Sequence, residues 1–93
     1  MLERQIEKFL TDNIKKIGGL SVKLNSSSFS GLPDRMILMQ KGRVYFVELK
    51  APGKKPRPLQ IVVHKMLNDL GFKVYVIDTK EKAGEFINAI QTT

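Results

Sequence analysis

The stretch Val-Tyr-Phe-Val-Glu-Leu-Lys-Ala, residues 44–51, decides how this chain folds. Its β-branched and aromatic residues predict a strand, and its almost continuous apolar character predicts a central strand with both faces covered. Glu48 and Lys50 lie in its second half and project from the same face, because strand side chains alternate. Burying a carboxylate and an ammonium is unfavourable unless they are paired or bound to a metal. The two charges are therefore either a structural ion pair or a metal-binding carboxylate beside a lysine that handles a water.

Size and composition narrow the possible functions. The 93 residues fit one domain, residues 1–93, and 42% hydrophobic residues is typical of a folded protein rather than a disordered one. There are 16 Lys and Arg against 9 Asp and Glu, and the resulting net charge of +7 favours a polyanionic partner, nucleic acid first. No segment approaches the roughly 20 consecutive apolar residues of a membrane-spanning helix. A membrane partner is therefore not expected.

The N-terminal sequence and the absence of Cys indicate a cellular compartment. Glu3 and Glu7 occupy a start where a signal peptide requires an apolar run, and the chain has no Cys. We therefore expect an intracellular, cytoplasmic protein without disulfides, thiolate chemistry or a Cys-based zinc site.

Hydrophobic periodicity predicts elements in the order αβββαβα. Roughly the first seventeen residues form a helix that ends at Gly18 and Gly19. Glu3 falls inside the apolar stripe of this helix, pointing toward the core, and Glu7 falls at its edge. The later segments are a strand at 20–25, a polar loop at 26–33, a strand at 34–39, a turn at 40–43, the central strand, a basic loop at 52–58, a helix at 59–70, a strand at 73–78 and a helix at 80–91.

Connection lengths predict how the strands pair. Short links make the first three strands an antiparallel meander, and the crossover helix lets the last strand lie parallel to the central one. The expected fold is an α/β mixed four-stranded sheet with helices on both faces. The crossover helix is identified by apolar residues at helical spacing, namely Leu59, Val62, Val63, Met66, Leu67 and Leu70.

Three charged groups are expected at one end of this sheet. Adjacent antiparallel strands place the start of one beside the end of the next, so Asp34 should lie near Glu48 and Lys50. Two carboxylates at short range repel each other unless a cation lies between them. Hard divalent ions such as Mg²⁺ take oxygen ligands of this kind beside phosphates. A metal site is the simplest explanation of the pattern.

The motif Gly31-Leu32-Pro33-Asp34, followed fourteen residues after the Asp by Glu48-Leu49-Lys50, resembles that of the PD-(D/E)XK nuclease superfamily. Within it the chain is similar to the VRR-NUC family, which has an acid near the start of the first helix, here Glu3, and a Gln opening the next helix, here Gln60. The resemblance covers nearly the whole chain. It implies a restriction-endonuclease-like fold, and small stand-alone members of the family are associated with phages.

The resemblance and the chemistry of phosphodiester hydrolysis together suggest the roles of the central residues. Asp34 and Glu48 would hold Mg²⁺ or Mn²⁺, with the backbone carbonyl of Leu49 as a further ligand. Lys50 would orient or deprotonate the attacking water and offset charge on the phosphate.

Residues on the two helices have more than one possible role. Glu3 would act on the metal directly or through its water shell, unless it is a capping or solvated glutamate, and Glu7 could take its place. Gln60 would hydrogen-bond near the site, or simply fill the first turn of its helix. His64 shares the helix face of Gln60, so it is either within reach of the phosphate or metal, or structural.

Basic and hydroxyl side chains around the site are candidates for binding the DNA backbone. The alternative for the loop cations is simple solvation. The predicted nucleic-acid contacts are Lys23, Ser28, Ser30, Lys54, Lys55 and Arg57. Phe29, between the two serines, could wedge into a DNA junction.

These observations predict a metal-dependent endonuclease that hydrolyses phosphodiester bonds in DNA. A four-way (Holliday) junction presents two scissile strands, so a homodimer with two sites matches it. The alternatives are a nuclease acting on flaps, nicks or linear duplex, and a non-catalytic DNA-binding module. The family resemblance makes a phage gene acting inside a host cell a possible origin.

Overall fold

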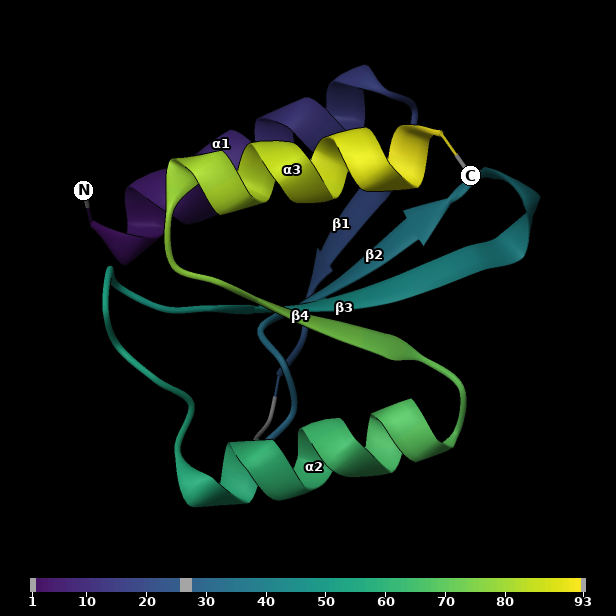
Figure 1. Cartoon of the computed structure of the whole chain (residues 1–93). Coiled ribbons are helices and arrows are strands. Elements are labelled where there is room, and N and C mark those ends of the chain that lie inside the picture. The colour runs from purple at the N-terminus through teal and green to yellow at the C-terminus, as the bar shows by residue number, and fades with distance from the viewer. Residues whose placement is uncertain (1, 26–27, 93) are drawn as a thin grey trace.

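The computed structural model describes residues 2–25 and 28–92 and has the predicted αβββαβα order, with one short 3-10 helix added in a turn (Figure 1). The elements are α1 (Glu3–Lys16), β1 (Leu20–Lys23), β2 (Arg35–Met39), η1 (Gln40–Gly42), β3 (Arg43–Leu49), α2 (Pro58–Asp69), β4 (Lys73–Ile77) and α3 (Lys80–Gln91). Within those described ranges, no helix is both long enough and apolar enough to cross a membrane.

The four strands form one mixed sheet in the order β1-β2-β3-β4, as predicted. β1, β2 and β3 pair antiparallel, and β3 pairs parallel with β4. Helices α1 and α3 lie side by side on one face of the sheet, and α2 covers the other face alone (Figure 1). The α/β sheet with helices on both faces is therefore confirmed.

The central strand divides its side chains between two unequal layers. Val47 and Leu49 join the main hydrophobic core, which is built with α1 and α3 and includes no residue of α2. Phe46 and Glu48 alternate with them and therefore face α2. Burial of all four residues confirms the expectation of a strand covered on both sides. The layer under α2 is the one that contains the charged residues.

Helix α2 is rotated so that much of its apolar surface faces solvent. Four of the apolar residues that identify this helix are between 49% and 74% exposed, namely Leu59, Val62, Met66 and Leu70. The buried residues of α2 are Gln60, Val63 and His64. Gln60 hydrogen-bonds both charged groups of the central strand, and such bonds are needed where a carboxylate is buried. Partnering a buried charge therefore fixes the rotation of this helix.

The expectation that Glu3 points into the core is wrong. Glu3 is exposed, and burial on α1 begins only at Ile6, so the first turn of the helix lies beyond the core. Glu7 is partly buried instead, and its Oε2 lies 2.9 Å from Nε of Arg35. Periodicity identifies the apolar stripe of a helix but does not show how far along the helix the core extends.

Candidate active site

Asp34 lies directly before β2 and reaches the end of β3. Its Oδ2 accepts a hydrogen bond from the backbone N–H of Leu49 at 2.7 Å. The register of the hairpin, in which Arg35 is opposite Val47, brings this about. The structure therefore places Asp34 beside the Glu48-Leu49-Lys50 segment, as the antiparallel arrangement predicted.

The loop that leads to Asp34 is pressed against α2. Gly31 has a φ of +91°, and a Cβ added there would come within 2.8 Å of Cγ2 of Val63 and 3.1 Å of the carbonyl oxygen of Leu59. Only glycine adopts this backbone conformation without strain and permits so close an approach. The loop carrying Asp34 and the helix carrying Gln60 are thus held in a fixed relation.

Glu48 is the most buried charged group of the site, with 1% of its surface exposed. Its Oε2 accepts hydrogen bonds from Nε2 of Gln60 at 2.8 Å and lies 3.0 Å from Nζ of Lys50. Its Oε1 is buried and has no hydrogen-bond partner among the described residues. Burial raises the pKa of Glu48, the hydrogen bond from Lys50 opposes this, and the charge of Asp34 adds to the rise. The free oxygen is therefore a ready acceptor for a cation.

Gln60 ties the charged groups together. Its Oε1 accepts hydrogen bonds from Nζ of Lys50 at 2.9 Å and from the backbone N–H of Arg57 at 2.8 Å, while its Nε2 donates to Glu48. These bonds fix which end of the amide faces each partner. Gln60 is therefore an integral part of the cluster and not simply a residue that fills the first helical turn.

His64 reaches the same cluster from the next turn of α2. Its Nε2 lies 4.0 Å from Oε1 of Glu48, and neither atom has a hydrogen-bond partner within the part of the chain that the structure describes. Burial lowers the pKa of His64, and the nearby charge of Lys50 lowers it further, although Asp34 acts in the opposite direction. Burial, the larger of these effects, favours the uncharged imidazole.

The remaining predicted residues lie outside this cluster. Glu3 is exposed at the start of α1 and has no hydrogen bond or ion pair to the cluster. The exposed residues at positions predicted to contact DNA are Lys23, Ser28, Ser30, Lys54, Lys55 and Arg57. Residues 26 and 27 of the predicted polar loop lie outside the described ranges. The loop cations follow β3 directly, so they lie next to the cluster along the chain.

Sequence reasoning missed the ion pair between Glu7 and Arg35. Arg35 follows Asp34 in the chain and also donates from Nη1 to the carbonyl of Ser21 at 3.4 Å. This pair fastens α1 to the start of β2 and so supports the position of Asp34. The position of Glu7 at the edge of the apolar stripe was the available signal, since such a residue can reach a cation on a neighbouring strand.

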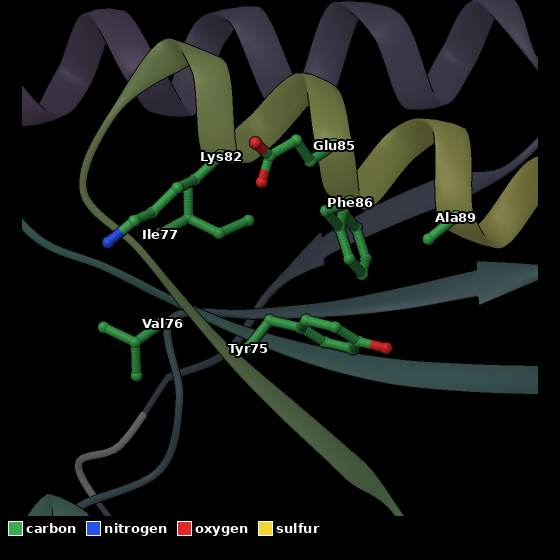
Figure 2. A pocket seen from close by; sticks show the side chains of 7 residues that line it. All are labelled: Tyr75, Val76, Ile77, Lys82, Glu85, Phe86 and Ala89. Carbon is green, nitrogen blue, oxygen red and sulfur yellow. The ribbon is translucent and has the colours of Figure 1, made fainter.

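A separate pocket lies between β4 and α3 (Figure 2). It is lined by Tyr75, Val76, Ile77, Lys82, Glu85, Phe86 and Ala89. None of these residues belongs to the cluster of Asp34, Glu48, Lys50 and Gln60. The convergence of charged groups that hydrolytic chemistry requires is found around Glu48 and not in this pocket.

Two known proteins are similar to this chain over most of its length. No family model matches the sequence. A protein of Acyrthosiphon pisum secondary endosymbiont phage 1, described as "Putative nuclease p44", is 43% identical over 79 residues, which cover 85% of each chain. A solved structure described as "VRR_NUC domain" matches with a TM-score of 0.86 and 29% identity, covering 92% of this chain and 94% of the other. With the fold, the motif order and both likenesses in agreement, the chain belongs to the VRR-NUC family.

Proposed function

We propose that this protein is a divalent-metal-dependent endonuclease that hydrolyses phosphodiester bonds in DNA. The observation that carries the proposal is the buried Oε1 of Glu48, which has no partner among the residues described, while Oε2 is held by Gln60 and Lys50. A buried carboxylate oxygen without a donor is unfavourable unless a cation completes it. Membership of the VRR-NUC family supports the same conclusion.

The residues present fit a hard divalent ion. Asp34 and Glu48 would hold Mg²⁺ or Mn²⁺, with the carbonyl of Leu49 as a third oxygen. Among the residues in the described ranges, no three His, Cys, Asp or Glu side chains lie close enough together to hold an ion without some side-chain movement. Such ions are commonly bound by one or two carboxylates and keep positions for water and substrate phosphate. The bound ion would polarise the phosphate and lower the pKa of a coordinated water.

Lys50 is suited to handle that water. Its Nζ lies within 3.0 Å of both Glu48 and Gln60, and its side chain is largely buried. A lysine held in this way has a defined position, so its charge acts on the attacking water or on the phosphate rather than on bulk solvent. Glu3 and Glu7 remain candidates for an outer contact with the water shell of the metal. Glu7 is the better supported of the two, because it pairs with Arg35, which follows Asp34 in the chain.

Two variants test the assignment. Asp34→Asn and Lys50→Ala should abolish cleavage of end-labelled DNA in Mg²⁺ or Mn²⁺ while leaving DNA affinity largely unchanged. Asp69→Asn and Lys65→Ala are matched controls, because Lys65 and Asp69 form an exposed ion pair on α2. Both control variants should cleave DNA at the wild-type rate. Cleavage by Asp34→Asn at the wild-type rate, or by the wild type in EDTA, would show that the metal site is wrongly assigned.

The loop at residues 52–57 is the proposed contact to DNA phosphates. It carries three exposed cations and is anchored at Gly53, whose N–H donates to Oδ2 of Asp78 at 3.2 Å. Replacing Lys54, Lys55 and Arg57 together by Ala should weaken binding to all DNA sequences alike. The slope of log affinity against log salt should fall by up to about three, one for each lost phosphate contact.

We further propose a homodimer that acts on branched DNA, including four-way junctions. The support is the exposed apolar face of α2, formed by Leu59, Val62, Met66 and Leu70. Exposed apolar patches of this kind mark association sites. Helix α2 carries one Lys and one Asp, which pair with each other, although the whole chain has a charge of +7. A second copy of the chain can therefore approach this face without charge repulsion. The face is not suited to DNA, because its one lysine is already paired with Asp69.

The substrate is tested by comparing rates on a four-way junction and on its linear duplex arms. Paired nicks in the junction, with little cutting of the arms, are expected of a two-site dimer. Equal rates on both substrates would replace this proposal with a general nuclease. Tight binding without cleavage of either would indicate a DNA-binding module.

A further inference from the structure

We propose that His64 is a ligand of the divalent ion through Nε2, and that it gives the site a preference for a first-row transition ion over Mg²⁺. The inference rests on the proposed function, because it concerns the ion that Asp34 and Glu48 would hold. It adds a nitrogen donor to a site otherwise made of oxygen.

Two polar atoms are left without partners at the same place. Nε2 of His64 and Oε1 of Glu48 are both buried and both lack a hydrogen-bond partner among the residues described. The side chains are 10% and 1% exposed, so bulk water does not satisfy them. Buried polar atoms almost always have a partner, and two without one at one spot indicate a missing group between them.

The distance between the two atoms also suits an ion that contacts both. At 4.0 Å they are too far apart to hydrogen-bond to each other. An ion that binds oxygen or nitrogen at about 2.1 Å could contact both atoms, because their separation is less than twice that bond length.

The two oxygens of Glu48 also differ in their partners. Lys50 and Gln60 already occupy the other oxygen of Glu48, so neither of them competes for Oε1.

The ligand set decides which ion is favoured. Mg²⁺ prefers oxygen donors throughout, whereas imidazole favours transition ions. Mn²⁺ binds most weakly of the first-row series, so a preference for Mn²⁺ over Mg²⁺ is a strict test of the idea. The rest of the ligand set, Asp34 and Glu48, is the same for either ion.

The decisive experiment is pulsed EPR on tag-free wild-type protein loaded with Mn²⁺, without DNA. The chain contains one histidine, so any imidazole nitrogen coupling to the ion comes from His64. We expect such a coupling, and we expect it to change when the histidine is isotopically labelled with heavy nitrogen. Because this measurement uses the wild type, it does not depend on the folding of a variant.

Metal titrations of variants give an independent readout. His64→Gln retains a polar side-chain end but not the imidazole, and should lose about tenfold or more in Mn²⁺ affinity with Mg²⁺ affinity little changed. Glu48→Gln should lose affinity for both ions. Mn²⁺ bound in a manner that depends on Glu48 but without nitrogen coupling would overturn the role of His64 and leave the proposed nuclease intact. Mn²⁺ binding that is indifferent to Glu48→Gln would overturn the metal site and the proposed function together.

Discussion

The two oxygens of Glu48 have different environments, and this difference organises the site. Oε2 is fixed by Gln60 and Lys50, whereas Oε1 is buried without a donor in the described part of the chain. The first set of contacts holds the carboxylate in place, and the second oxygen stays available. A buried carboxylate with hydrogen-bond partners on only one of its oxygens is typical of a site in which a ligand binds the other oxygen.

The raised pKa of Glu48 makes the stability of the metal-free protein depend on pH. Because folding raises the pKa above its ordinary value of 4.5, the folded state binds this proton more tightly than the unfolded state. The stability contributed by this proton is therefore present at low pH and is lost as the pH rises through the raised pKa. Each kcal/mol lost lowers Tm by roughly 4–8 °C in a domain of this size.

This dependence is measured as Tm against pH in EDTA for wild type and Glu48→Gln, which keeps an acceptor for Gln60 and Lys50 but cannot ionise. The variant should be the more stable of the two near neutral pH, and the gap should close as the pH falls toward 4.5. Saturating Mg²⁺ should raise the Tm of the wild type and not that of the variant. A gap that is constant across this pH range would contradict the assigned cause.

For individual residues, the sequence predicted which charged groups meet but not all of their partners. Alternation and antiparallel pairing were sufficient to bring Asp34 to Glu48 and Lys50. The pairing of Glu7 with Arg35 joins residues 28 positions apart on different elements, and it depends on where α1 lies over the sheet. Hydrophobic periodicity does not specify that placement.

Among the elements, the loop before β2 and helix α2 act as one unit because they meet at Gly31. We expect Gly31→Ala to destabilise the protein by about 1–3 kcal/mol, since the new methyl group would strain a left-handed backbone and contact Val63. Cleavage should fall as well, because the same loop positions Asp34. The measurements are urea unfolding and the cleavage rate at a temperature where the variant remains folded.

Gly84→Ala is the matched control. Gly84 lies in α3, and a Cβ there would meet no atom within 4 Å. Alanine favours a helix over glycine, so this variant should be more stable than wild type by roughly 0.5–1 kcal/mol. Equal effects of the two substitutions would mean that neither the left-handed backbone nor the contact with Val63 requires glycine at position 31.

The elements themselves were largely predictable, but the rotation of α2 was not. Apolar spacing located this helix within one residue at each end, because Pro58 and Gly71 mark its limits. The same spacing gave no indication that Gln60 and His64 would be its buried side. That choice depends on a charge on another element, and a helix read alone carries no information about its neighbour.

For the whole molecule, the exposed face of α2 makes a prediction about assembly. Val62→Glu and Met66→Glu should each shift the protein from dimer to monomer in sedimentation at micromolar concentration, because a charge would be buried at the proposed interface. Ile61→Glu is the matched control, since Ile61 is 56% exposed, like Val62 at 55%, but points about 100° away around the helix. A wild type that is monomeric alone and on DNA would contradict the paired-site model.

The separation of the hydrophobic core from the site has a consequence for dynamics. The core cluster joins α1, α3 and the sheet and leaves α2 out. The buried residues of α2 are Gln60, Val63 and His64, of which only Val63 is apolar, and Gln60 bonds to Glu48 and Lys50. Amide hydrogen exchange should therefore show α2 opening at a lower free energy than α1 and α3, as a unit of its own. Mg²⁺ should slow exchange in α2 more than in α1. Helix α2, which completes the site, would then be the element that unfolds locally most readily. Ion binding and the local order of α2 would therefore be coupled.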